Sequence, residues 1–140
     1  MASINFTSVF DDMARGNINF ASDTFKAMLV TASYVPNKDT HTKRSDVTNE
    51  VSGAGYTAGG AATTCTVSKD TVNDRVELTF SDVVWANASL TGRAAVIYKS
   101  RGGAASADEL VAYVDFGQDV TSTNGDFTAD FTTPLRINNP

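Results

Sequence analysis

The chain has 140 residues, of which 41% are hydrophobic and 19% charged, with a formal net charge of −5 and a single cysteine. The acidic balance argues against nucleic acid as a partner, because phosphate binding needs a clustered positive field, and one cysteine excludes an internal disulfide. Without a signal-peptide pattern or an apolar run near the ~20 residues of a membrane span, the sequence predicts one soluble domain over 1–140, made in a reducing cytoplasm, with no membrane partner.

The N-terminal segment is expected to form a short helix and then a strand. Thr7 or Ser8 can cap a helix near 8–15, and Gly16 is placed to end it. After a polar break, the run TFKAMLVTASYV (24–35) has apolar residues on both parities. This pattern predicts a strand whose two faces are both covered.

A loop and helix insertion near 36–60 follows. Val47 and Val51 are four residues apart, which predicts a second short helix with Gly53 as its C-cap. The glycines after it resemble a phosphate-binding loop, but the spacing from Gly53 to Gly59 is one residue too long and no lysine follows. A dinucleotide-binding loop would lie between a strand and a helix, the reverse of the order expected here. We therefore interpret these glycines as a turn.

The rest of the chain is expected to be β-structure. Asn124-Gly125 predicts a hairpin between VAYVDF and DFTADF. With short strands at 8–12-residue intervals, the pattern predicts an all-β, antiparallel β-sandwich with one or two short helices in its N-terminal third. The predicted strands are AATTCTVSK (61–69), DRVELTFSDVVWA (74–86), GRAAVIYKS (92–100), DELVAYVDFG (108–117) and GDFTADFTTPLRI (125–137).

Residues that carry catalytic chemistry do not form a recognisable constellation. His41 is the only histidine and lies in a polar run, so we interpret it as a solvated loop residue. Cys65 lies between threonines in a predicted strand and is expected to be a buried or half-buried thiol. The adjacent carboxylates Asp108 and Glu109 are poorly placed for acid–base work on a shared face. The run DVTSTNGD (119–126) departs from a calcium loop in its glycine position and acidic count.

Several segments together resemble the capsid-decorating, or cementing, proteins of tailed bacteriophages. The most specific part is DVTNEVSGAGYTAGG (46–60), followed some 25 residues later by a tryptophan and an AVIYK strand, within a resemblance that covers roughly 1–137. The resemblance implies a jelly-roll or closely related sandwich on the outer surface of an icosahedral head. It also implies binding to the major capsid protein, with no cofactor and no enzymatic role.

Two other functions stay open at this stage. Trp85 ends an apolar run, which favours a core or interface anchor, but it can also be read as a sugar-stacking platform. In that second interpretation the protein is a host- or carbohydrate-binding module of a tail or fibre, with Trp85 and Tyr56 as stacking residues. A hydrolase that uses His41 is the third class.

For the capsid role, the sequence suggests particular contacts. The 36–60 region, with Lys43 and Arg44, is expected to face the capsid protein, and Tyr56 is expected at the tip of the glycine-rich loop. Because edge strands have unpaired backbone groups that must be covered or used, copies are expected to associate through a face or edge of the sandwich. An isologous dimer is preferred and a trimer comes next.

Overall fold

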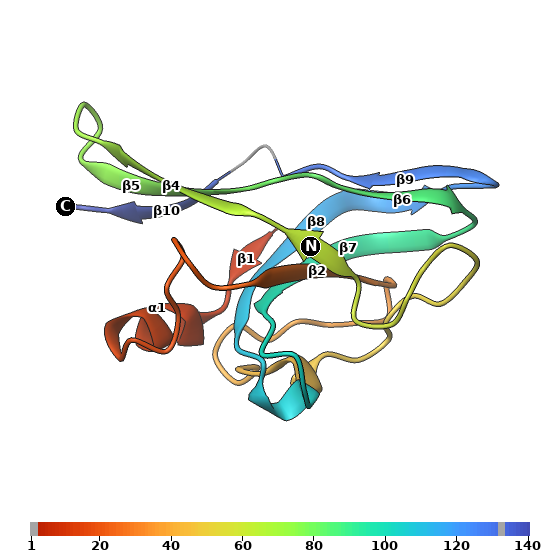
Figure 1. Ribbon diagram of the computed structural model, residues 1–140, viewed down its shortest axis with the longest axis horizontal. Coiled ribbons are helices and arrows are strands. Elements are labelled where there is room, and N and C mark those ends of the chain that lie inside the picture. Colours follow the sequence, from red (N-terminus) through yellow and green to blue (C-terminus); the bar gives the residue numbers. More distant parts are fainter. Residues whose placement is uncertain (1–2, 132–133) are drawn as a thin grey trace.

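The computed structural model describes residues 3–131 and 134–140, and antiparallel strands are its main regular structure (Figure 1). One α-helix, α1, spans Thr7–Ala14, and short 3-10 turns span Arg44–Asp46 and Ala105–Ala107. The all-β prediction is confirmed. The strands are β1 Ile4–Asn5, β2 Phe25–Val30, β3 Ala61–Thr63, β4 Cys65–Asp70, β5 Arg75–Phe80, β6 Val83–Ala88, β7 Thr91–Lys99, β8 Leu110–Thr121, β9 Gly125–Ala129 and β10 Leu135–Asn138.

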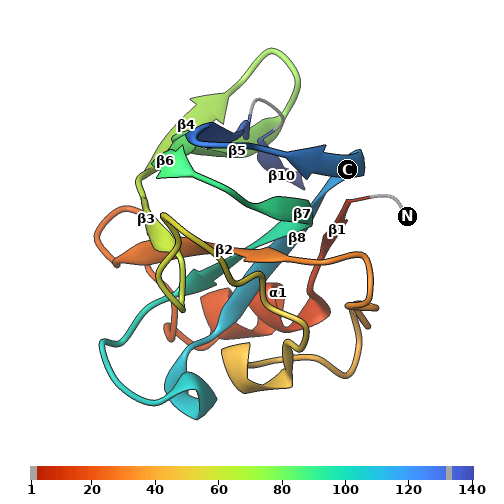
Figure 2. The same cartoon turned by 90° about the vertical axis from the view of Figure 1, so that its right-hand side faces the viewer.

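The strands form two layers. The first is a five-stranded sheet in the order β1-β8-β7-β2-β3, and the second contains β10-β5-β4 and β6-β9. Strand β3 leads directly into β4 through Thr64, so this segment carries the chain from the first layer to the second on one side. On the opposite side, β1 forms the edge of the first layer next to β8 (Figure 2). The result is a sandwich of two antiparallel layers.

The second layer has two parts, β10-β5-β4 and β6-β9. Leu78 of β5 faces Leu135 of β10, and Val83 of β6 faces Ala129 of β9. Strands β5 and β6 follow one another along the chain, as do β9 and β10, and each succession contributes one strand to each of the two parts of this layer. The predicted strands 74–86 and 125–137 are thus each broken in two.

Two predictions about pairing are wrong. The run 61–69 is split at Thr64, with β3 in the first layer and β4 in the second. The turn at Asn124 is present, with φ of +48°, but β9 after it pairs with β6 and not with β8. The expected hairpin therefore does not form, because the turn moves the chain from one layer to the other.

Hydrophobic clusters cover both faces of the first layer. Along β2, Phe25, Ala27 and Leu29 point into the cluster between the layers. The alternate residues Met28 and Val30 belong to a second cluster on the opposite face. Each of these five side chains is at most 3% exposed, which confirms the prediction that this strand is covered on both faces. The outer cluster also contains Phe6, Tyr34, Ala94, Val96, Tyr98, Leu110 and Tyr113.

The helical predictions are confirmed only in part. Helix α1 ends before Gly16, whose φ is +76°, as expected of a glycine past a helix end. Its N-cap is Phe6 without a side-chain hydrogen bond, so the predicted cap is wrong, and the Thr7 hydroxyl instead donates to Asp39 at 2.9 Å. The predicted helix at 45–53 does not form beyond the turn Arg44–Asp46. Val51 belongs to the cluster between the layers, and its amide donates to the carbonyl of Leu29 on β2. Val47 packs against the outer cluster instead.

Candidate interaction surfaces

Arg44 is held by contacts within the molecule. Its Nε donates to Asp108 Oδ2 at 2.8 Å, and its guanidinium lies 5.1 Å from the centre of the Tyr98 ring. The Tyr98 hydroxyl in turn donates to the carbonyl of Gly59, and burial raises the pKa of Tyr98 to about 12. Only 21% of the Arg44 side chain is exposed, so the main role of this residue is to stabilise the fold through these internal contacts. Lys43 is more open and lies 3.9 Å from Glu109.

The two carboxylates paired with these cations form a buried ionic network. Asp108 and Glu109 are 1% and 2% exposed. Arg101 donates to both oxygens of Glu109, at 2.8 and 2.7 Å, and this bidentate contact lowers the pKa of Glu109. Arg101 and Lys99 also donate to the carbonyl of Asn17. The network therefore ties the loops near residues 17, 44 and 101–109 together.

Tyr56 and Trp85 are adjacent but turned inward. Their ring centres are 5.7 Å apart, and Trp85 is 6% exposed within the core. The Tyr56 hydroxyl donates to Glu50 Oε1 at 2.7 Å and accepts a hydrogen bond from the amide of Leu29 at 3.0 Å. Glu50 also accepts from Gly59 N at 2.6 Å. The expected exposed tip at Tyr56 is therefore wrong, because the glycine-rich loop folds back onto β2.

Removing only the hydroxyl of Tyr56 is expected to destabilise the protein. The Tyr56→Phe variant removes one of the two hydrogen bonds that Glu50 Oε1 accepts, and it removes the hydroxyl to which the Leu29 amide donates, at a cost of about 1–3 kcal/mol in the free energy of unfolding. Urea denaturation measures the loss. The matched control is Tyr113→Phe, whose hydroxyl makes no hydrogen bond to another residue in the described part of the chain. Equal losses in the two variants would contradict this role of Tyr56.

The surroundings of His41 differ from those predicted, whereas those of Cys65 agree with the prediction. His41 is partly buried, and its Nδ1 lies 2.8 Å from the hydroxyl of Tyr34, so it is more than a solvated loop residue. Cys65 is half-buried as predicted, and burial raises its pKa to about 11, which keeps it a neutral thiol near pH 7. Within residues 3–131 and 134–140, no three histidine, cysteine or acidic side chains gather in a metal-binding arrangement.

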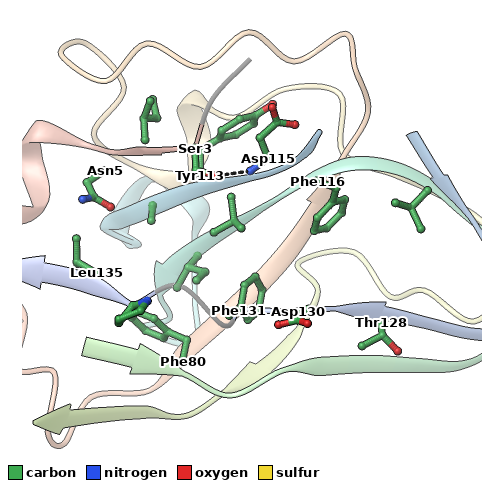
Figure 3. Close-up of a pocket in the computed structure, with 16 residues that line it drawn as sticks. Ser3, Asn5, Phe80, Tyr113, Asp115, Phe116, Thr128, Asp130, Phe131 and Leu135 are labelled. Atoms are coloured by element: carbon green, nitrogen blue, oxygen red, sulfur yellow. Dashed lines mark hydrogen bonds between the residues drawn. The ribbon is translucent and has the colours of Figure 1, made fainter. Parts of the chain in front are cut away.

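A cavity of about 580 Å³ lies at the open side of the sandwich, between β1 and β8 of the first layer and β9 and β10 of the second (Figure 3). Its apolar lining includes Val114, Phe116 and Phe131, and Asp115 and Asp130 also line it. Sequence reasoning missed this site. The alternation of Val114 and Phe116 was visible, but the strand was expected to end at 117, whereas β8 continues to Thr121.

The β4–β5 hairpin forms a second exposed feature and extends past the end of the first layer (Figure 1). At its turn, Asp70 accepts hydrogen bonds from the amides of Val72 and Asn73 and from the Asn73 side chain, at 2.8–3.1 Å. Arg75 lies 3.3 Å from the same carboxylate. This turn presents Val72 with 89% of its surface exposed. A large apolar side chain held out by an ordered turn is a candidate contact point.

Comparisons with protein families, with curated proteins and with solved structures find no match to this chain. The only α-helix among the described residues, α1, is eight residues long, and no helix there has the length and apolar character to cross a membrane.

Proposed function

We propose that the protein is a non-enzymatic structural component of a tailed-phage particle. It decorates the outer surface of the icosahedral head and cements it by bridging neighbouring major capsid proteins. The observation that carries this proposal is the projecting β4–β5 hairpin with Val72 at its tip. A bridging protein needs contact surfaces that are well separated, and the hairpin and the sandwich body supply them. Many copies bind at once, so modest contacts at each site are sufficient.

The hairpin replaces the contact surface expected from the sequence. Arg44 and Tyr56 are engaged by Asp108 and Glu50, so a change at either residue alters the fold as well as any interface. The outer edge of β4, where Val67 is 46% exposed, is the candidate for self-association as a dimer, with a trimer next. The carbohydrate-binding alternative relied on exposed rings at Trp85 and Tyr56, and their inward position gives it no support.

The cementing role is tested by comparing heads with and without the protein. Heads that lack it are expected to break at a lower temperature than decorated heads. When the salt concentration is lowered, they are also expected to break before decorated heads do. A Val72→Asp variant is expected to bind heads about tenfold more weakly, because burial of a valine is worth roughly 1.5 kcal/mol. Binding is measured as occupancy after sedimentation of the heads.

The control for the hairpin tip is Val35→Asp, which places the same charge at another exposed valine, 66% exposed. This variant is expected to bind like the unmodified protein. Equal resistance of bare and decorated heads to heat and to low salt would show that the cementing role is wrong. If Val72→Asp and Val35→Asp weakened binding equally, the hairpin tip would not be a specific contact with the head.

A further inference from the structure

The outer edge of β4 is a regular strand edge that has no partner strand among the described residues. β4 ends the order β10-β5-β4, and its pairing with β5 runs from Cys65 to Asp70 without a bulge. In Figure 2, β3 and β4 lie on the same side of the molecule, away from β1. Residues 1–2 and 132–133 precede β1 and β10 in the chain, and these strands lie at the opposite ends of the strand orders from β3 and β4. The edge is therefore built from Cys65–Asp70, all of which the structure describes.

Hydrogen bonds on the two sides of β5 show which backbone groups of β4 point outward. The amide of Ser81 donates to the carbonyl of Thr64 at 2.9 Å. On the other side, the amide of Asn139 donates to the carbonyl of Asp74 at 2.8 Å, which gives the same alternation. In an antiparallel pair only every second residue exchanges hydrogen bonds with its partner strand, so Thr64 and every second residue after it face β5. The residues between them direct their N–H and C=O groups to the outer edge, and they are Cys65, Val67 and Lys69.

The side chains of β4 leave this edge accessible to another strand. Thr66, Val67, Ser68 and Lys69 are all exposed, and 46% of the surface of Val67 is open to solvent. Proline and bulges, two common protections of edge strands, are both absent from β4. Lys69 is its only positively charged residue, so it opposes pairing only in a register that places it against another cation. The edge is therefore a template for strand addition.

One register matches this edge to a second copy of itself. An antiparallel pair with its two-fold axis at Val67 places Val67 opposite Val67 of the second copy, and Cys65 opposite Lys69. All three outward residues then exchange backbone hydrogen bonds, and the two valine side chains pack on the same face of the sheet. A slide of two residues in either direction leaves Cys65 or Lys69 opposite a residue outside β4. A register centred on Lys69 places two like charges together. The register centred on Val67 is therefore the best matched.

We propose that two copies of the protein pair in this register through their β4 edges, so that the β10-β5-β4 sheets of both copies form one continuous sheet. The self-match of the edge favours a second copy over an extended segment of another protein. Residues 61–69 contain no aspartate or glutamate, so the net charge of −5 is not concentrated at the contact. A contact along one strand edge falls below about 1,200 Å² in total, the range of weak and transient association. The pair is therefore expected in concentrated solution and where copies are held close together.

This pairing has a consequence for the bridging role, which rests on the proposed function. Val72, at the hairpin tip, follows Val67 by five positions. Because a strand rises about 3.3 Å per residue and the two copies run in opposite directions from the axis, the two tips lie roughly 30 Å apart. One dimer thus carries two exposed valines at opposite ends of the joined sheet, and it can contact two neighbouring capsid proteins.

The experiment traps the pair with disulfides in the full chain, under mild catalysed oxidation in concentrated solution. In the proposed register Lys69→Cys lies opposite the native Cys65 of the second copy, at the Cα separation of about 5.5 Å that a disulfide spans. The expected product is a covalent dimer linked between residues 65 and 69, identified by mass spectrometry of its peptides. The matched control is Ser68→Cys, which is exposed on the same edge but points to the other face of the sheet. It is expected to give at least about tenfold less covalent dimer.

A second variant makes the result independent of the half-buried native thiol. Val67→Cys is expected to form a symmetric dimer linked between the two copies of residue 67. Equal trapping of Lys69→Cys and Ser68→Cys, or no covalent dimer from either Lys69→Cys or Val67→Cys, overturns the pairing. The oxidation is repeated on decorated heads, where a link from residue 69 to the major capsid protein in place of the 65–69 dimer assigns the edge to that protein instead. Trapping in solution needs no heads, so the pairing can fail while decoration stands, and failure of the unmodified protein to bind heads leaves the pairing intact.

Discussion

Gly60→Ala is expected to cost about 4 kcal/mol or more in the free energy of unfolding, whereas Gly102→Ala costs roughly 1 kcal/mol. Both glycines have φ of +79°, so the backbone penalty for a side chain is the same at the two positions. Their surroundings differ. A Cβ at Gly60 would overlap the carbonyl of Ala27 and lie 2.7 Å from Met28 Cα, whereas a Cβ at Gly102 meets nothing within 4 Å.

The larger cost follows from what surrounds Gly60. The overlapping atoms are backbone atoms of β2, which lies between β7 and β3 and is buried on both faces, so they cannot move aside without disturbing the sheet. A loss of this size is a large part of the 5–15 kcal/mol that stabilises a typical domain. Urea denaturation of the two variants measures the difference. Similar midpoints for both would show that the loop at Gly60 can move off β2, contrary to this account.

The glycine-rich segment also shows what the sequence could reveal. Its interpretation as a turn, and not a phosphate loop, agrees with the structure, because Gly59 and Gly60 turn the chain into β3 with positive φ. Alternation of side chains located the strands because burial depends on it. The same signal could not show where a strand changes layer. That change is made at Thr63 and Thr64 by bonds to Ser81, such as Thr63 Oγ1 to the Ser81 carbonyl at 2.7 Å.

The candidate site was harder to predict for a related reason. Lys43 and Arg44 looked like an exposed basic pair, but the partner of Arg44 is Asp108, 64 residues away. Nothing in the local pattern links the two, because the loops meet only after the sheet has formed. The aromatic pair of Tyr56 and Trp85 is a similar case, since the loop of one lies on the strand of the other. The cavity at Phe116 depends on a bulge in β8 that has no periodic signal.

Glu109→Gln is expected to lower the free energy of unfolding at pH 7 by about 2–3 kcal/mol. Loss of one partner of a buried ion pair typically costs about 3–5 kcal/mol. The cost is smaller here because the side chains of Arg101 and Lys43 are 43% and 36% exposed and can turn to water. Glutamine keeps the shape of the side chain, so the change removes the charge and one of the two oxygens that accept hydrogen bonds from Arg101.

The pH dependence separates this ionic role from simple packing. The hydrogen bond from Arg101 lowers the pKa of Glu109 in the folded protein below its ordinary value of 4.5. The unfolded chain therefore takes up the proton at higher pH than the folded one, so the stabilisation is fully present above pH 4.5 and is lost as pH falls through the folded pKa. Stability curves of the unmodified protein and Glu109→Gln are expected to converge in acid.

Other carboxylates do not obscure that difference. Hydrogen bonds from the amides of Thr42 and Lys43 lower the pKa of Asp46, but this group is present in both proteins and its contribution cancels. The control is Asp11→Asn, whose partner Arg15 lies in an exposed pair with 69% and 59% of the two side chains open to solvent. It is expected to change stability by less than about 1 kcal/mol. A Glu109→Gln curve that stays parallel to that of the unmodified protein down to pH 3 would show that Glu109 stabilises the loops by packing alone, without its charge.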